Sequence, residues 1–210
     1  AIRADSLEEM FHIAAIFEKK IDFENNRIQV ITNGGGYGIV STDAIANSKN
    51  LRMSELSSIS ISEIRKKSTH HMNVGNTLDL LGDATTERYR EALNISLLDK
   101  NVDGILLIVL YQTPLLTTEI VEVITEAHHN SKKPIIVIST GGEFTELLSR
   151  SLMERGIPVF NFPTETITAL DKVMSYQLRH KHIKPIVVKE EVVEKIVKKT
   201  KKVNVKKNRK

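Results

Sequence analysis

The stretch DGILLIVLY, residues 103–111, decides the fold of this 210-residue chain. It is almost entirely apolar, which is typical of a strand buried on both faces of a parallel sheet. A second apolar run, PIIVIST, occupies residues 134–140, and RIQVIT at 27–32 has the brevity and β-branching of a third strand. Because helical patterns separate these runs, the sequence favours an α/β fold with a parallel sheet and helices on both faces.

The remaining elements follow from periodicity and turn residues. After the first strand we expect a helix that ends near Ser48, and Gly156 should cap the C-terminus of a later helix. Further helices are expected at 60–67 (with Ser60 and Glu63 at its start), 85–99, 117–130 and 164–177, and weaker strands at 51–56, within 74–85 and at 157–162.

The N-terminal segment predicts an amphipathic helix. Ser6 and Glu9 have the spacing of a capping box. The residues expected to share its apolar face are Leu7, Met10, Phe11, Ala14 and Phe17. We assign residues 1–22 to this helix, as the end of a preceding domain, residues 23–180 to the α/β domain, and residues 181–210 to a basic linker or tail.

Charge is divided unevenly along the chain. Residues 181–210 contain 12 Lys or Arg and 3 Glu, a net charge of +9, which leaves −5 for residues 1–180 of a chain whose total is +4. Residues 189–202 predict a basic amphipathic helix within this tail, with Val192, Val193, Ile196 and Val197 on one face. Since the tail has no aromatic residue for base stacking, we expect a linker or packing helix and no nucleic-acid partner.

Composition excludes several classes of protein. No run approaches 18 apolar residues, so no membrane span is expected, and no signal peptide is visible. The absence of cysteine removes disulfides, thiolate metal sites and cysteine nucleophiles. A cytoplasmic location is therefore the default expectation.

The glycine loop VITNGGGYGIVSTDAI, residues 30–45, is the main candidate site. Its glycines at 34, 35, 36 and 38 match neither the dinucleotide fingerprint nor a P-loop, because position 39 is Ile. Glycines let an anion approach the backbone closely, and the helix that follows offers free N–H groups and a positive dipole end. The alternative is a plain strand-to-helix turn, and composition does not choose between the two.

Other polar groups carry weaker signals. In a parallel sheet, ligands bind at the carboxyl ends of the strands, which here lead into the loops 33–38, 111–118 and 140–143. Asp79 and Asp83 are better explained as loop hydrogen-bond acceptors or a helix cap than as an acid/base pair. The adjacent pairs His70–His71 and His128–His129 point apart, so no metal site is expected.

Five blocks, in this order, identify a resemblance that extends from about Ser6 to Gln177: VITNGGGYGIVSTDAI, VGNTLDLLGDATTERYREAL, VDGILLIVLYQTPLLTTEIVE, KPIIVISTGG and RGIPVFNFPTETITAL. Together they resemble the NDP-forming acyl-CoA synthetases (ADP-forming acetyl-CoA synthetase and relatives), which are kin of succinyl-CoA synthetase. In that family an ATP-grasp module phosphorylates a histidine, whose loop carries the phosphoryl group to the acid and CoA site. The resemblance implies that this chain is the flavodoxin-like ligase domain, followed here by the basic helical tail.

The resemblance also implies site residues. The phosphoryl-transfer site would be formed by Asn33, Gly34, Gly35, Gly36, Gly38, Gln112, Thr113 and Thr117, with Asn76, Asp79 and Gly82 in a supporting role. Family members carry the phosphohistidine in an S/G-H-T/A-G-type motif, which includes none of His12, His70, His71, His128, His129, His180 and His182. We therefore expect no catalytic residue in this chain and a phosphohistidine upstream of Ala1.

Cofactors and partners follow from the same resemblance. The whole enzyme would use ATP/ADP, CoA and Mg²⁺ with a small carboxylic acid, and this chain alone would bind none of these cofactors. Its partners would be the CoA-binding and ATP-grasp domains or subunits of the same synthetase. The alternative is a non-catalytic flavodoxin-like binding or regulatory module that kept the fold and lost the chemistry.

Overall fold

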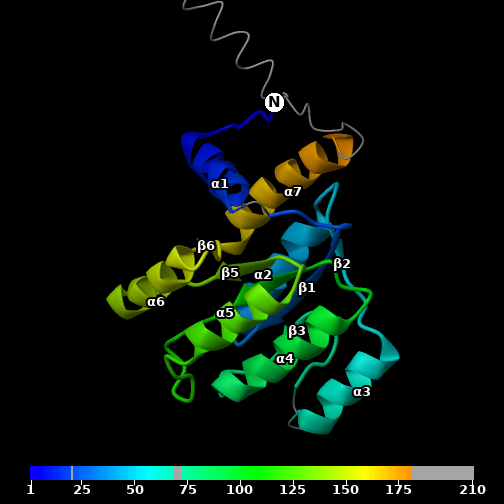
Figure 1. Ribbon diagram of the computed structural model, residues 1–210, viewed down its shortest axis with the longest axis vertical. Helices are drawn as coiled ribbons and strands as arrows, with labels where there is room; N and C mark the ends of the chain where they lie inside the picture. Colours follow the sequence, from blue (N-terminus) through cyan, green and yellow to red (C-terminus); the bar gives the residue numbers. More distant parts are fainter. Residues whose placement is uncertain (20, 69–71, 181–210) are drawn as a thin grey trace, which may run out of the picture. The chain divides into compact units, whose positions relative to one another are not determined.

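The computed structural model describes residues 1–19, 21–68 and 72–180, which form one parallel sheet with helices on both faces (Figure 1). The strands are β1 (Arg27–Thr32), β2 (Arg52–Met53), β3 (Leu78–Asp79), β4 (Gly104–Ile108), β5 (Ile135–Ile138) and β6 (Val159–Phe160). The helices are α1 (Leu7–Glu18), α2 (Gly35–Ala46), α3 (Ser58–Lys67), α4 (Thr86–Leu98), α5 (Ile120–Asn130), α6 (Glu143–Glu154) and α7 (Pro163–His180). The helix predicted at 189–202, like His70, His71 and His182, lies outside the described residues.

The strand order confirms the predicted fold class. The order is β2-β1-β4-β5-β6, and every pair of strands is parallel. Without the short β3, this is the 2-1-3-4-5 order of flavodoxin-like sheets. β2 and β3 share one edge of β1, since β2 pairs with Arg27 and Ile28 while β3 pairs with Ile31 and Thr32. β1 and β4 therefore lie side by side at the centre of the sheet.

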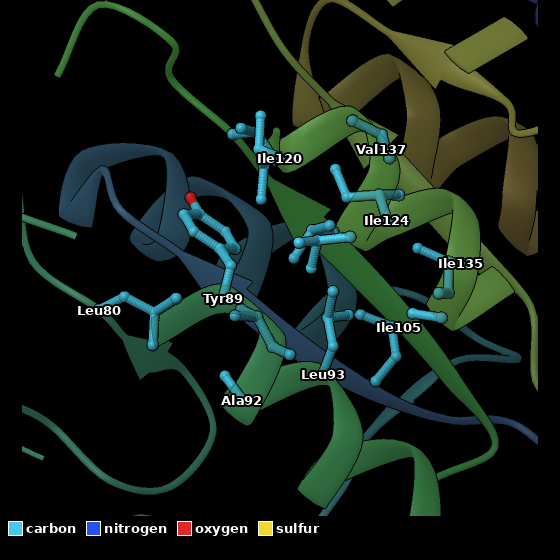
Figure 2. Packing of buried hydrophobic residues seen from close by; sticks show 14 of the residues in the cluster. Leu80, Tyr89, Ala92, Leu93, Ile105, Ile120, Ile124, Ile135 and Val137 are labelled. Carbon is cyan, nitrogen blue, oxygen red and sulfur yellow. The ribbon is translucent and has the colours of Figure 1, made fainter. Parts of the chain in front are cut away.

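Alternate residues of the central strands enter two hydrophobic clusters. Ile105 and Leu107 of β4 join the cluster on the face covered by α3, α4, α5 and α6, whereas Leu106 and Ile108 join the cluster beneath α1, α2 and α7. Figure 2 shows the first cluster, in which Tyr89 and other side chains of α4 pack with those of α5 over β4 and β5. Burial on both faces explains why residues 103–111 lack polar alternation.

An ion pair connects the amino ends of the two central strands. The Arg27 side chain donates to Asp103 through Nε at 2.7 Å and Nη2 at 2.9 Å, and the Arg27 backbone N–H donates to the same carboxylate at 2.9 Å. Burial alone would raise the pKa of Asp103, but the hydrogen bonds from Arg27, with a further one from Asn25, outweigh burial and hold this pKa below its ordinary value. The pair sits opposite the carboxyl edge, so it stabilises the sheet without entering the candidate site.

We expect Asp103→Asn to lower the free energy of unfolding at neutral pH by about 2 kcal/mol, below the usual range for a broken buried pair because Arg27 stays partly exposed. A carboxyl whose pKa is depressed by folding stabilises the protein above its unfolded pKa, about 3.9, and loses this effect as the pH falls through the folded pKa. Urea unfolding of both proteins at pH 7 and at acid pH checks this. A difference that grows on acidification would contradict it.

Several predicted boundaries were wrong. α3 begins at Ser58 and is capped by Ser57, whose side chain accepts from the Ser60 N–H, so Ser60 lies inside the helix and does not start it. The strand predicted at 51–56 is only two residues long, and β4 ends at Ile108 although the apolar run continues. Gly156 was placed correctly, with φ of +87° after α6. Apolar runs predict that a strand exists, but pairing partners decide where it ends.

The predicted apolar face of α1 was also wrong. Ser6 caps this helix as expected, by accepting from the Glu9 N–H. Ile13 and Ile16 are the buried residues, however, and the predicted face points away from the core. Residues Ala1–Leu178 form one compact unit, so α1 packs on the domain assigned to 23–180. That α1 ends a preceding domain remains a prediction.

None of the described helices has the length and apolar character needed to cross a membrane.

Candidate functional site

The candidate site lies where the carboxyl ends of β1 and β4 meet. After β1 the chain continues to β2 on one side of this pair, and after β4 it continues to β5 on the other side. The pair β1 and β4 is therefore the switch point of the sheet. The loop after β1 leads directly into α2, and the loop after β4 leads to α5. Neighbouring parallel strands thus bring two segments about 80 residues apart to one edge, as the sequence predicted.

Asn33 connects these two loops. Its Oδ1 accepts from the Leu110 N–H at 2.9 Å, and its Nδ2 donates to the Leu110 carbonyl at 3.0 Å and to Thr113 Oγ1 at 3.1 Å. Asn33 is only 4% exposed. Because both amide hydrogens have protein acceptors, the side chain positions the two loops and has no hydrogen left to donate to a ligand.

Tyr89 of α4 stabilises the end of β4, next to these two loops. It is fully buried, and its hydroxyl donates to the carbonyl of Ile108, the last residue of β4, at 2.7 Å. Burial, together with the nearby Tyr111, raises the pKa of Tyr89 well above its ordinary value, so the hydroxyl remains a donor. Sequence analysis missed this residue, since a single tyrosine within a polar helical pattern gives no sign that it reaches under the sheet edge.

The glycine loop is a tight strand-to-helix connection. Thr32 Oγ1 accepts from the Gly34 N–H at 2.9 Å. A Cβ on Gly34 would lie 2.5 Å from Leu110 Cδ1, and one on Gly38 would lie 3.1 Å from the methyl groups of Thr32 and Thr77. Close packing therefore favours glycine at Gly34 and Gly38, which supports the turn interpretation of the loop.

The first turn of α2 has no side-chain cap. Its N-cap, Gly34, offers no side-chain oxygen, and α5 and α6 also lack a side-chain cap, whereas Ser6, Ser57 and Thr85 cap α1, α3 and α4. Within the described part of the chain, the N–H groups of Gly35, Gly36 and Tyr37 have no hydrogen-bond acceptor. A Cβ on Gly36 would meet no atom within 4 Å. Free N–H groups, a positive dipole end and open space together suit an oxyanion.

Asp79 borders this turn. Its Oδ1 accepts from the Leu81 N–H at 2.9 Å, and its Oδ2 lies 3.2 Å from the place that a Cβ on Gly35 would take. Asp83 pairs with Arg88 at 2.7 Å, and the hydrogen bond from Arg88 lowers the pKa of Asp83. Both carboxylates act as loop hydrogen-bond acceptors, as expected. The negative charge of Asp79 would repel an anion beside Gly35, so an anion bound to this turn should lie on the Gly36 side.

The polar side chains of the loop between β4 and α5 already form hydrogen bonds within the protein. Gln112 Nε2 turns toward α6 and donates to the Thr140 carbonyl at 2.9 Å, and the hydroxyls of Thr117 and Thr86 lie 2.9 Å apart. α5 begins at Ile120, later than predicted, and the Ile120 N–H bonds to the Thr117 carbonyl at 3.2 Å. The predicted residues Gln112, Thr113 and Thr117 thus reach the correct edge but bind protein partners.

Asn76 has a structural role that its sequence position did not reveal. Its side-chain amide accepts from the Val30 N–H at 3.0 Å and donates to the Ile28 carbonyl at 2.7 Å. It therefore fills the gap between β2 and β3 along β1, where no strand residue pairs. Gly82 lies in the turn before α4, and a Cβ there would meet no atom within 4 Å.

The comparisons with known proteins fit this geometry. A family model described as the Ligase-CoA domain matches residues 28–179. The chain belongs to the Ligase-CoA domain family. This Ligase-CoA domain starts one residue into β1 and includes the glycine loop, the switch point and almost all of α7.

Curated relatives of this Ligase-CoA domain are named as ligases. The chain is 28% identical over 170 residues to the ADP-forming acetate–CoA ligase II subunit alpha of Pyrococcus furiosus, covering 79% of this chain and 37% of the relative. It is 29% identical over 175 residues to the ADP-forming acetate–CoA ligase I of Archaeoglobus fulgidus, covering 83% and 24%. It is 26% identical over 180 residues to the ADP-forming 4-hydroxybutyrate–CoA ligase of Nitrosopumilus maritimus, covering 84% and 25%.

Solved structures agree on the fold. A Pyrococcus horikoshii protein superposes with a TM-score of 0.78 at 26% identity, covering 86% of this chain and 42% of the other. The apo form of a dinucleotide-forming acetyl-coenzyme A synthetase 1 from Candidatus Korarchaeum cryptofilum gives 0.76 at 25% identity, covering 85% and 39%. The chain thus spans less than half the length of these relatives.

Proposed function

We propose that this Ligase-CoA domain is part of an ADP-forming acyl-CoA synthetase, which converts a small carboxylic acid, CoA and ATP reversibly to acyl-CoA, ADP and phosphate. Support comes from the relatives, which are named as ADP-forming acetate– or 4-hydroxybutyrate–CoA ligases. Because those relatives are more than twice as long as their match to this chain, the CoA-binding, ATP-grasp and phosphohistidine parts belong to other domains or subunits of the same enzyme.

Within this proposal, the first turn of α2 receives the phosphoryl group as it passes between the phosphohistidine and the acid. The observation that carries it is the set of three N–H groups, on Gly35, Gly36 and Tyr37, that have no acceptor among the described residues. A transferring phosphoryl group spreads its negative charge over three oxygens and needs fixed donors that cost no reorganisation. Asn33 connects this turn to Leu110, just after β4, and Thr32 Oγ1 accepts from the Gly34 N–H, so both residues keep the donors in place.

The remaining candidate residues take supporting roles in the proposal. Asp79 keeps the oxyanion on the Gly36 side, and Asn76 holds the carboxyl half of β1 from its open edge. Gln112, Thr113 and Thr117 set the shape of the opposite loop, because their side chains already bond within the protein. Gly82 keeps the rim before α4 unobstructed.

Cofactors follow from the enzyme class. ATP/ADP and CoA would be used by the whole synthetase. Mg²⁺ would accompany the nucleotide, since the described residues include no cluster of three or more His, Asp or Glu that could ligate a metal ion. A cytoplasmic location remains part of the proposal. A non-catalytic regulatory module is not favoured, because the relatives are named as ligases.

The proposal predicts activity for the complete synthetase and none for the 210-residue chain alone. With ATP, CoA and a panel of short carboxylic acids, the complete enzyme should form acyl-CoA and ADP. The chain alone should form no acyl-CoA and should take up no label from γ-labelled ATP, since no histidine in it lies in a phosphohistidine motif. Mass spectrometry of the products and phosphoprotein labelling check both points.

Two results would contradict the proposal. One is a complete enzyme that forms no acyl-CoA from any acid of the panel while it binds CoA and ATP. The other is stoichiometric phosphorylation of a histidine within residues 1–210. Either phosphorylation or acyl-CoA formation by this chain alone would require a nucleotide-binding site within it. The proposal assigns that site to the ATP-grasp part, outside this chain.

A further inference from the structure

Helix α1 has two apolar faces. Its inner face is formed by Ile13 and Ile16, which are buried against the sheet domain. Its outer face exposes three large apolar side chains, which we call the outer stripe: Leu7 (73% exposed), Met10 (43%) and Phe11 (65%). A surface helix normally has a single apolar stripe, and apolar residues on both sides are typical of a helix that is covered on both sides.

Packing fixes the direction of the outer stripe. Lys172 of α7 bonds to Asp5 at 2.7 Å and to Glu9 at 2.7 Å, which ties the start of α1 to α7. At the other end, Phe17 packs edge-on against Tyr176, with ring centroids 5.6 Å apart. Figure 1 shows α1 beside α7 along one flank. Because both ends are held, α1 cannot rotate to bury the outer stripe in its own domain.

A contiguous exposed stripe marks an interaction surface, whereas single exposed apolar residues do not. We propose that the outer stripe is the docking surface for another domain of the same synthetase, so this inference rests on the proposed function for its occupant. The relatives extend far beyond their match to this chain, which leaves more than half of each for such a domain. The family match begins at residue 28, so α1 lies outside the segment that the Ligase-CoA domain model covers.

Charge argues against a second copy of this chain as the occupant. The exposed carboxylates of Glu8 and Glu18 flank the outer stripe, and Glu18 has only a 3.4 Å contact with Lys19. Two such helices packed together would bring like charges against each other at the edge of an apolar contact. The occupant should therefore present apolar side chains flanked by Lys or Arg.

Photo-cross-linking in the complete synthetase tests this surface. A benzoyl-phenylalanine placed at Phe11 should cross-link to a peptide outside residues 1–210, in a yield at least about fivefold above a control position that faces solvent. Leu98, which is 84% exposed on α4, is the matched control. Cross-links only within residues 1–210, cross-links between two copies of this chain, or equal yields at both positions would each overturn the proposal.

A substitution gives a second readout. Phe11→Asp would place a charge in the apolar contact, and in the complete synthetase we expect proteolytic cleavage near α1 to become at least about tenfold faster, with no change for Leu98→Asp. Equal cleavage rates for the two variants would count against docking. Neither readout uses activity, so a synthetase that fails to form acyl-CoA yet gives the cross-link would reject the proposed function and keep the docking surface.

Discussion

Gly36→Val in the complete synthetase should reduce phosphoryl transfer at least about a hundredfold, the scale for losing preorganised oxyanion donors, while the domain stays folded. A Cβ on Gly36 meets no protein atom within 4 Å, so a side chain there has room in the absence of substrate. The same side chain would enter the space in front of the free N–H groups of α2 and displace the phosphoryl oxygens. Rapid-quench measurement of phosphoryl transfer per folded molecule gives the result.

Two controls separate this effect from a loss of stability. Gly36→Ala should keep or slightly raise the unfolding midpoint, since alanine is a better helix former than glycine, and should still slow transfer. Gly142→Ala changes another glycine at a helix start where a Cβ meets no atom, and it should leave transfer normal. Full specific activity in folded Gly36→Val would mean that the loop is only a turn. A slow Gly142→Ala variant would show that the effect is not specific to α2.

Asn33→Asp should lower the free energy of unfolding by about 2–4 kcal/mol at neutral pH, because it removes two donors and buries an unpaired charge. Its new carboxylate oxygen would face the Leu110 carbonyl, now 3.0 Å from Nδ2, and Thr113. Burial and the facing carbonyl should raise the pKa of this carboxyl in the folded state above its unfolded value of about 3.9. The loss should therefore shrink as the pH falls below the folded pKa and be complete above it.

Urea unfolding between pH 4 and 8, with Asn161→Asp as an exposed control, measures this dependence. We expect transfer to slow as well, since the turn of α2 loses its attachment to β4. A variant as stable as the parent at pH 8 would show that Asn33 does not hold the switch point. Stability that increases with pH would contradict the direction of the shift.

The centre of the fold was predictable because burial on both faces leaves a direct trace in the sequence. Every residue of β4 and β5 is buried. For this reason the central residues of the stretches 103–111 and 134–140 are all apolar. A strand was predicted within residues 74–85, where β3 lies, but its position in that range could not be predicted. β3 is two residues long. Next to it, the side chain of Asn76 accepts a hydrogen bond from the Val30 N–H of β1, although asparagine in a sequence usually indicates a turn.

The glycine loop shows the limit of sequence reasoning at the site. Four glycines look alike in the sequence, yet Gly34 and Gly38 lie close to the side chains of Leu110, Thr32 and Thr77, whereas Gly36 faces open space. Only three-dimensional packing separates these two reasons for a glycine. The turn interpretation is supported at Gly34 and Gly38, whereas the oxyanion interpretation, which depends on Gly36, remains a prediction.

The prediction of the buried face of α1 failed for a related reason. Its outer and inner apolar residues overlap in spacing, and the sequence contains no information on which side the domain lies. Likewise, Gln112 and Thr117 come at the predicted edge, but their partners Thr140, Thr145 and Thr86 belong to other elements. Loop positions follow from topology, whereas the direction of a polar side chain depends on contacts distant in sequence.

A crystal structure of the complete synthetase grown with inorganic phosphate would test the phosphoryl site most directly. We expect a phosphate oxygen within about 2.7–3.2 Å, hydrogen-bond distance, of the backbone nitrogens of at least two of Gly35, Gly36 and Tyr37. Bound phosphate on the Gly36 side of Asp79 would also fit the charge at this turn. A phosphate held elsewhere in the transfer site, with the first turn of α2 in contact only with water or protein, would contradict the proposed role of the glycine loop.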